Sequence, residues 1–230
     1  MRLLLVSCVV CVTLFVLGRS SVLAQERMRG EREIGFGVRG AWGSSNITFQ
    51  PSQNRQARSS YEFGLAFRLA QLKHLGMVCE LLYAQTGYQT TEYTARVTGH
   101  PVPTGQPFEC REAWLRFPLF MHLKFPLSFF QVEVLGGGYA DYLLSEQIGA
   151  TSTSLYQQTL YLSTHNRLGV GIEGGAGLGV RTPIGNFMLE YRTWYRLTNL
   201  YDRERVPKQD EPRSNVRNQS VGVAYYYVFH

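Results

Sequence analysis

The alternation of side chains in residues 112–145 constrains the fold more than any other feature of this chain. Before residue 125 every second side chain is apolar, whereas the intervening positions include Arg116, His122 and Lys124. Successive side chains of a β-strand point to opposite faces, so a period of two residues indicates strands. The alternation pauses at residues 125–128 and then resumes, which predicts a hairpin with one uncharged face. That face holds Leu115, Phe117, Leu119, Met121 and Leu123 before the turn, and Phe130, Val132 and Val134 after it.

Two prolines, Pro118 and Pro126, lie in this stretch and argue against a helix. A proline has no N–H to donate to a sheet, and it normally marks a bulge or an edge. Because the alternation continues on both sides of Pro118, we expect a β-bulge there.

The same alternation recurs in six further segments, so the chain is predicted to contain eight strands. One face is free of charge in all of them. Aromatic side chains gather near the strand ends on this face, as they do in the interfacial girdles of membrane barrels. The segments lie within residues 34–42, 61–69, 77–84, 168–181, 187–197 and 221–229, and the aromatic residues are Trp42, Tyr61, Tyr83, Tyr195, Tyr225 and Tyr227.

The opposite face collects seven acids and seven bases, together with many glycines and alanines. Opposite charges in equal number are expected where side chains must neutralise one another out of bulk water. We therefore expect a polar network inside a narrow barrel. Its predicted members are Glu62, Arg68, Glu80, Arg116, Glu133, Glu173, Glu190, Arg192 and Arg196, and the wider set of charges adds Arg39, Glu112, Lys124, Asp141 and Arg181.

Connections between the predicted strands alternate in length. Three are short, at residues 69–75, 125–128 and 182–186, whereas residues 43–60, 89–110, 145–165 and 199–215 form long polar connections. Short turns on one side, long loops on the other and an even number of strands are typical of outer-membrane barrels. Residues 33–230 are thus predicted to form an eight-stranded antiparallel up-and-down transmembrane β-barrel. The alternative is a soluble secreted barrel, which has an apolar interior and a polar exterior.

The first residues have the features of a secretory signal peptide. Arg2 precedes an apolar run from Leu3 to Leu17, and Val22-Leu23-Ala24 forms a small-residue cleavage site. We expect residues 1–24 to be removed and residues 25–32 to form a short N-terminal segment; an uncleaved N-terminal anchor is the alternative. Loss of Arg2 and Arg19 lowers the formal charge from +6 to +4, an excess that does not require a nucleic-acid partner.

Two cysteines remain outside the predicted signal peptide, Cys79 and Cys110. An oxidising compartment permits a disulfide between them. However, a hairpin centred near Gly99 places Cys79 opposite about residue 119 instead of Cys110. We predict two free thiols, one of them packed against lipid.

Several segments resemble the PorT-like outer-membrane β-barrel proteins of Bacteroidetes-type bacteria. The resemblance covers nearly the whole predicted mature chain, and it departs at the end, where His230 follows the terminal aromatic Phe229. It implies a barrel in the outer membrane and, more loosely, an accessory role in protein secretion. The matching segments are residues 37–49, 64–88, 113–125, 136–145, 169–180, 189–201 and 221–229.

Residues 169–174 match the G-x-G-x-x-G pattern of dinucleotide-binding proteins, but a strand turn follows them where that motif needs a helix. We therefore interpret these glycines as small interior positions and predict no cofactor. No spacing of ligands suggests a metal site. His122 is expected to hydrogen-bond inside the barrel. The predicted loops contain His100 and a possible catalytic group, which consists of Ser163, Thr164, His165 and Asp202.

An eight-stranded barrel has an interior just wide enough for side chains, so charged residues are expected to fill it. The leading hypothesis is an outer-membrane structural or interaction component, accessory to protein secretion or envelope assembly, which is not an enzyme. Its expected partners are outer-membrane lipid and other envelope proteins that bind its long loops. The alternatives are a small-solute pore and a membrane-embedded hydrolase or acyltransferase.

Overall fold

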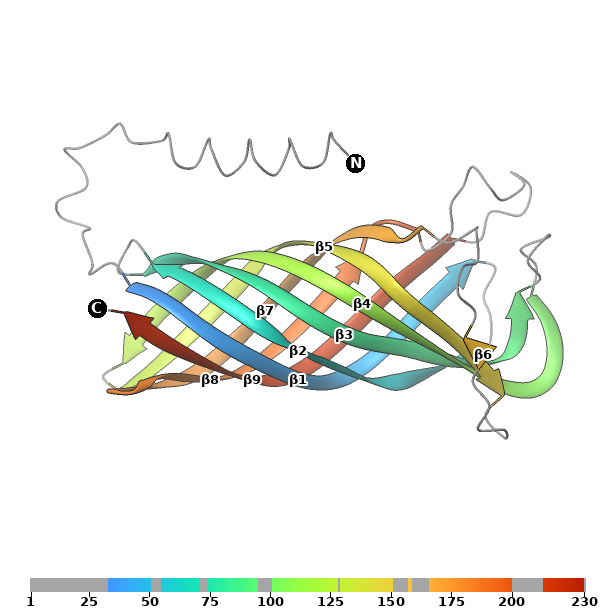
Figure 1. Ribbon diagram of the computed structural model, residues 1–230, viewed down its shortest axis with the longest axis horizontal. Helices are drawn as coiled ribbons and strands as arrows, with labels where there is room; N and C mark the ends of the chain where they lie inside the picture. The colour runs from blue at the N-terminus through green and yellow to red at the C-terminus, as the bar shows by residue number, and fades with distance from the viewer. Residues whose placement is uncertain are drawn as a thin grey trace, which may run out of the picture.

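The computed structural model describes residues 33–50, 55–70, 74–94, 101–127, 129–150, 157–158, 166–199 and 213–229. These residues form β-strands joined by turns (Figure 1). Residues 1–32, which include the predicted signal peptide, lie outside the described residues. The strands are β1 (Glu33–Gln50), β2 (Arg55–Ala70), β3 (Leu75–Thr94), β4 (Pro101–Leu127), β5 (Phe130–Ala150), β6 (Gln157–Gln158), β7 (Leu168–Thr182), β8 (Gly185–Arg196) and β9 (Arg213–Phe229).

Eight antiparallel strands close into a barrel, as the alternation predicts. Neighbours in the sequence pair along the sheet from β4 back to β1, β1 pairs with β9, and the sheet continues through β8, β7 and β5. Pairing of β5 with β4 closes the ring. The two-residue strand β6 lies outside this ring and pairs only with the end of β5 among the described residues.

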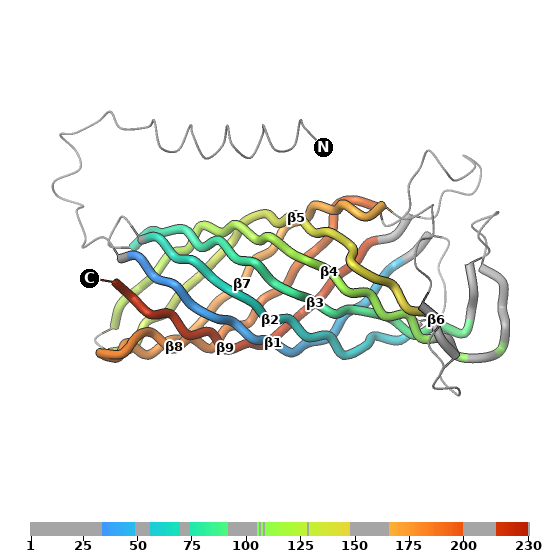
Figure 2. The backbone as a smooth tube through the Cα atoms, in the orientation of Figure 1, coloured from blue at the N-terminus to red at the C-terminus, as the bar shows by residue number. Residues whose placement is uncertain are grey.

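The strands cross the barrel obliquely, as Figure 2 shows, which is the tilt that closure of a sheet requires. At one end, which we call the turn end, lie the start of β1, the end of β9 and the connections β2–β3, β4–β5 and β7–β8. The opposite end, which we call the extended end, contains the remaining connections. There β3, β4 and β5 reach beyond the other strands (Figure 1).

The structure corrects two of the four predicted loops at the extended end, residues 43–60 and 89–110, because most of each is strand. β1 and β2 cover most of residues 43–60, and β3 and β4 cover most of residues 89–110. Polar side chains there still allow a backbone ladder, as in the pairs Ser45–Asn218 and Gln89–Glu109. The alternation of apolar side chains in the sequence stops at the edge of the apolar exterior, whereas the backbone hydrogen bonds between the strands continue past it.

The predicted bulge at Pro118 is also wrong. The ladder between β3 and β4 keeps one register across Pro118, with Cys79 opposite Leu119 and Leu82 opposite Arg116. The register of β4 against β5 shifts between Ala113 and Trp114 instead. Proline fits extended backbone and lacks only its own N–H, so one hydrogen bond can be missing without a change of register.

The exterior of the barrel is an apolar belt. Leu119 is 50% exposed and Phe36 48%, although both are large hydrophobic side chains in regular strands. Trp42, which is 70% exposed, lies opposite Tyr61 on the side of the belt nearer the extended end. Among the described residues no helix is long and apolar enough to cross a membrane. Large hydrophobic side chains are exposed and most of the charged side chains are buried, so the inverse pattern is excluded for the described strands.

Candidate functional site in the charged interior

All nine residues of the predicted polar network lie buried inside the barrel. Strand alternation places them there, because each occupies the face opposite the apolar belt. Arg116 and Arg192 are among the largest fully buried side chains of the protein. The network therefore places buried charged side chains across the interior of the barrel.

Glu62 is the centre of the network. It accepts hydrogen bonds from Arg39 at 2.9 Å and from Arg116 at 3.0 Å. Trp194 donates its indole N–H to the same carboxylate at 2.8 Å, and the Asn218 amide donates at 3.3 Å. One carboxylate of β2 thus connects side chains of β1, β4, β8 and β9.

Arg192 forms a second centre next to the first. It donates to both carboxylate oxygens of Glu80, at 2.7 and 2.8 Å, and lies 2.8 Å from Glu190 on its own strand. Glu190 also accepts from Arg39 at 3.2 Å, and Glu173 accepts from Arg116 at 2.7 Å. Each of these arginines therefore contacts at least two carboxylates, which is the pairing that buried charge requires.

Arg68 and Glu133 are paired toward the turn end, at 3.0 Å. His122 makes a 2.6 Å hydrogen bond to Glu133 through Nδ1, so it takes part in the interior network as predicted. The Arg68 guanidinium also stacks over the Tyr226 ring, 4.0 Å from its centroid. Together these groups occupy the barrel between the central network and the turn end.

Aromatic rings fill the interior toward the extended end. Arg116 lies between the rings of Tyr139 and Trp194, 4.2 and 4.3 Å from their centroids. Ile47 and Val216 pack against these two rings and are nearly inaccessible to solvent. The central ion pairs are therefore covered by apolar groups on this side.

Glycines of β7 make room for the network. A Cβ at Gly171 would lie 2.4 Å from the Tyr139 ring, and one at Gly169 would lie 2.2 Å from the Asp141 carboxylate. β7 continues to Thr182 and leads through a turn into β8, so no helix follows the G-x-G-x-x-G sequence. The interpretation as small interior positions is confirmed for Gly169 and Gly171, whereas Gly174 lies on the outward face with Ile172.

The structure changes the predicted charge balance. Arg181 is exposed beside the β7–β8 turn, one residue past the last pair of β7 with β5. Glu146, which the alternation pattern does not single out, is buried. Among the described residues the buried set therefore holds eight acids and six bases: Glu62, Glu80, Glu112, Glu133, Asp141, Glu146, Glu173 and Glu190 against Arg39, Arg68, Arg116, Lys124, Arg192 and Arg196.

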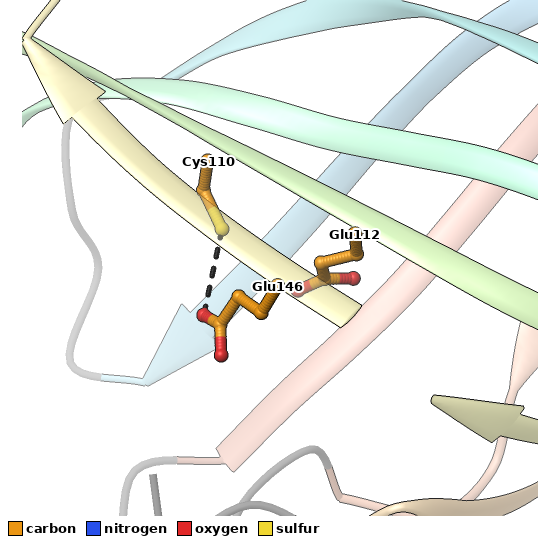
Figure 3. Close-up of side chains that lie close together, drawn as sticks. All are labelled: Cys110, Glu112 and Glu146. Carbon is orange, nitrogen blue, oxygen red and sulfur yellow. Dashed lines mark hydrogen bonds between the residues drawn. The ribbon is translucent and has the colours of Figure 1, made fainter. Parts of the chain in front are cut away.

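Both described cysteines are free thiols, as predicted. Cys79 is exposed on the apolar belt, opposite Leu119, whereas Cys110 is buried and lies opposite Tyr88. Cys110, Glu112 and Glu146 come together inside the barrel near the extended end (Figure 3). No local spacing indicates this group, because its third member lies on the next strand; the sequence signal is only Cys110 and Glu112 two residues apart.

The loop residues proposed as an alternative catalytic group, namely Ser163, Thr164, His165 and Asp202, lie outside the described residues, as does His100. A catalytic role for them stays a hypothesis.

A family model for the outer membrane protein β-barrel domain matches residues 23–202. Solved structures similar to this chain include Ail, the attachment invasion locus protein of Yersinia pestis, at 12% identity and a TM-score of 0.43, with 86% of this chain and 100% of Ail covered. Another is Neisserial surface protein A, at 10% identity and a TM-score of 0.42, with 83% of this chain and 96% of that protein covered. A comparison with curated protein sequences gives no match.

Proposed function

The chain belongs to the outer membrane protein β-barrel domain family, and on that premise we propose that it is a closed barrel that acts by binding another envelope protein. The filled interior is the observation that carries this proposal. Arg116 and Arg192 are completely buried between carboxylates and aromatic rings. A path for ions would have to break several of these contacts at once, because eight strands leave an interior only as wide as its side chains.

The extended end is the proposed binding surface. There β3, β4 and β5 continue beyond the apolar belt, and their outward side chains change from apolar to polar. Glu109 and Arg111 form an outward ion pair at 2.9 Å, and Arg58 of β2 pairs with the same glutamate. Long strands and loops on the outer surface of such barrels face the cell exterior.

The partner that we propose belongs to a protein secretion or envelope assembly system. The sequence resemblance to PorT-like barrels supports this choice, and so do the buried, paired side chains that occupy the described interior. A cleaved signal peptide over residues 1–24 would carry the chain across the inner membrane, and lipid would contact the apolar belt. We assign the protein no catalytic role.

Conductance tests the closed state. Purified barrel inserted into a planar bilayer should leave the current at the level of protein-free membrane. A stable open channel would overturn the closed state and favour the small-solute pore.

Co-purification tests the partner. Affinity purification from the native outer membrane in mild detergent, followed by mass spectrometry, should recover one envelope protein at near one-to-one stoichiometry. Arg111→Glu should lose this partner, whereas the matched control Arg181→Glu, an exposed arginine at the turn end, should retain it. Recovery of wild-type barrel alone would overturn the accessory role, and equal loss in both variants would overturn the choice of surface.

A further inference from the structure

Three side chains with metal-binding atoms meet inside the barrel near the extended end. Cys110 and Glu112 are two residues apart on β4 and therefore point to the same face, and Glu146 of β5 lies directly opposite Glu112. One ligand atom from each residue lies within 4.8 Å of the others, and all three residues are buried. Figure 3 shows the Cys110 thiol directed at the Glu146 carboxylate, with the Glu112 side chain beside them.

Their separation fits a small tetrahedral ion. Zinc binds cysteine sulfur at about 2.3 Å and carboxylate oxygen at about 2.0–2.2 Å, so tetrahedral angles place the sulfur about 3.6 Å from the oxygen. The Cys110 thiol donates a hydrogen bond to Glu146 Oε1, with 3.6 Å between sulfur and oxygen, and loss of the thiol proton would leave the two atoms at the separation of two ligands. Thiol and carboxylate are therefore already spaced as two ligands of one ion.

The surrounding charge favours a divalent cation. The buried acids exceed the buried bases by two among the described residues, as the set given above shows. Two of the eight acids, Glu112 and Glu146, stand opposite one another on paired strands. Like charges at such positions repel, and a bound cation removes that repulsion.

Thr86 supplies an independent indication of a ligand. It lies opposite Glu112 on β3, on the same interior face, and is 1% exposed. Its hydroxyl oxygen has no hydrogen-bond partner among the described residues. A buried hydroxyl without a partner is costly, and a metal ion or its bound water satisfies it.

We propose that Cys110, Glu112 and Glu146 bind one divalent transition-metal ion of the zinc type, with the fourth position directed toward Thr86. The thiol selects such an ion against Mg²⁺ and Ca²⁺, which take oxygen ligands. On binding, the thiol releases its proton to solvent and the thiolate coordinates the ion.

The ion would join β4 to β5 beside the register shift at Ala113 and Trp114. It would hold the base of the extended end in place above the apolar belt.

Cobalt absorption tests the site, because a thiolate bound to Co²⁺ gives a near-ultraviolet charge-transfer band. The full chain carrying Cys8→Ser, Cys11→Ser and Cys79→Ser, folded in detergent, should give a band that saturates at one equivalent of Co²⁺ and that Zn²⁺ abolishes. Adding Glu146→Gln should weaken Co²⁺ binding at least tenfold, and adding Cys110→Ser should remove the band. The lower mobility of unfolded barrel in electrophoresis after heating verifies that each variant folds.

Absence of the band in the parent protein would overturn the proposal, and so would unchanged affinity after Glu146→Gln. A second measurement needs no substitution at the site. Zn²⁺ should shift the urea midpoint of the wild-type barrel upward with concentration, while Mg²⁺ should not. Equal shifts with both ions would show nonspecific binding and overturn the site.

Discussion

Arg192 and Glu80 join opposite walls of the barrel through two hydrogen bonds of 2.7 and 2.8 Å. β8 and β3, the strands that carry them, are separated in the ring by β9, β1 and β2 on one side. A bidentate pair across the full width of the barrel fixes the distance between the walls as well as balancing charge. The interior network is thus part of the scaffold.

Removing one interior carboxylate should destabilise the barrel. Glu190→Ala deprives Arg39 and Arg192 of one partner each, and we expect the free energy of unfolding to fall by about 3 kcal/mol. Glu62→Ala should cost more, because Arg39, Arg116 and Trp194 all donate to that carboxylate. Urea unfolding in one detergent measures both.

Glu109→Ala is the matched control, since Glu109 pairs with arginines on the partly exposed outer surface. Its effect should stay below about 1 kcal/mol. If Glu190→Ala and Glu109→Ala shift the urea midpoint equally, the interior pairs are solvated.

Adding a methyl group inside the barrel should also destabilise it. At Gly171 a Cβ meets the Tyr139 ring and the Tyr195 carbonyl oxygen, each at 2.4 Å. Gly171→Ala should therefore cost about 1–3 kcal/mol. Gly136→Ala, at an outward position with no atom within 4 Å of a new Cβ, should change the urea midpoint little. A tolerated alanine at Gly171 would contradict the tight packing of the network.

A charge introduced on the apolar belt should lower the free energy of unfolding by an amount that depends on its depth in the membrane. Leu119→Arg lies among the apolar side chains of β4, and it should cost about 2–4 kcal/mol in a lipid bilayer. Ser44→Arg, which points outward beyond Trp42, should cost at most about 1 kcal/mol, as arginine does near the interface. Unfolding from lipid vesicles gives both values, and equal costs would contradict the membrane position of the belt.

The Cys110 thiol should react slowly in the folded protein. It lies beyond the apolar belt, since its neighbours Glu109 and Arg111 are charged and face outward. Burial raises the pKa of the Cys110 thiol well above its usual value, and the nearby carboxylates of Glu112 and Glu146 raise it further. With Cys8, Cys11 and Cys79 changed to serine, a maleimide should label Cys110 only after unfolding. Rapid labelling of the folded protein at neutral pH would contradict its burial.

The same thiol makes stability fall at high pH. Above about pH 8.5 the unfolded thiol loses its proton, whereas the folded thiol keeps it. The unfolded state then binds fewer protons than the folded state, so the free energy of unfolding decreases as the pH rises. Cys110→Ser should reduce that decrease in urea titrations between pH 8 and pH 10, and an identical slope in both proteins would contradict the raised pKa.

Alternation along the strands was enough to predict the strands and to sort their residues into two faces, because the side-chain period of a strand is geometric. The choice of the charged face as the interior needed three further features: its small residues, the aromatic residues near the strand ends and the unequal loop lengths. Together these features predicted the interior positions of Arg116 and Glu190. The strand lengths at the extended end were not predictable in this way, since Ser45 and Gln89 pair through their backbones and give no apolar signal.

The group around Cys110 depends on register as well as alternation. Glu146 reaches Cys110 only because the shift at Ala113 and Trp114 sets the offset between β4 and β5. The extra residue of this bulge is Leu144 of β5, which has no partner on β4, whereas the sequence led us to expect a bulge at Pro118 of β4. A site formed by residues of two strands beyond a bulge therefore cannot be identified from the alternation of the sequence and becomes visible only in the structure.

The pairing of β1 with β9 has a consequence for how the protein is made. The first and last strands close the ring together, from Ile34 opposite Phe229 to Gln50 opposite Arg213. A chain that ends before Arg213 would expose unpaired backbone on both β1 and β8, and hydrocarbon cannot satisfy those groups. The ring can therefore close only after β9 has been synthesised, which makes closure one of the last events in the assembly of this protein.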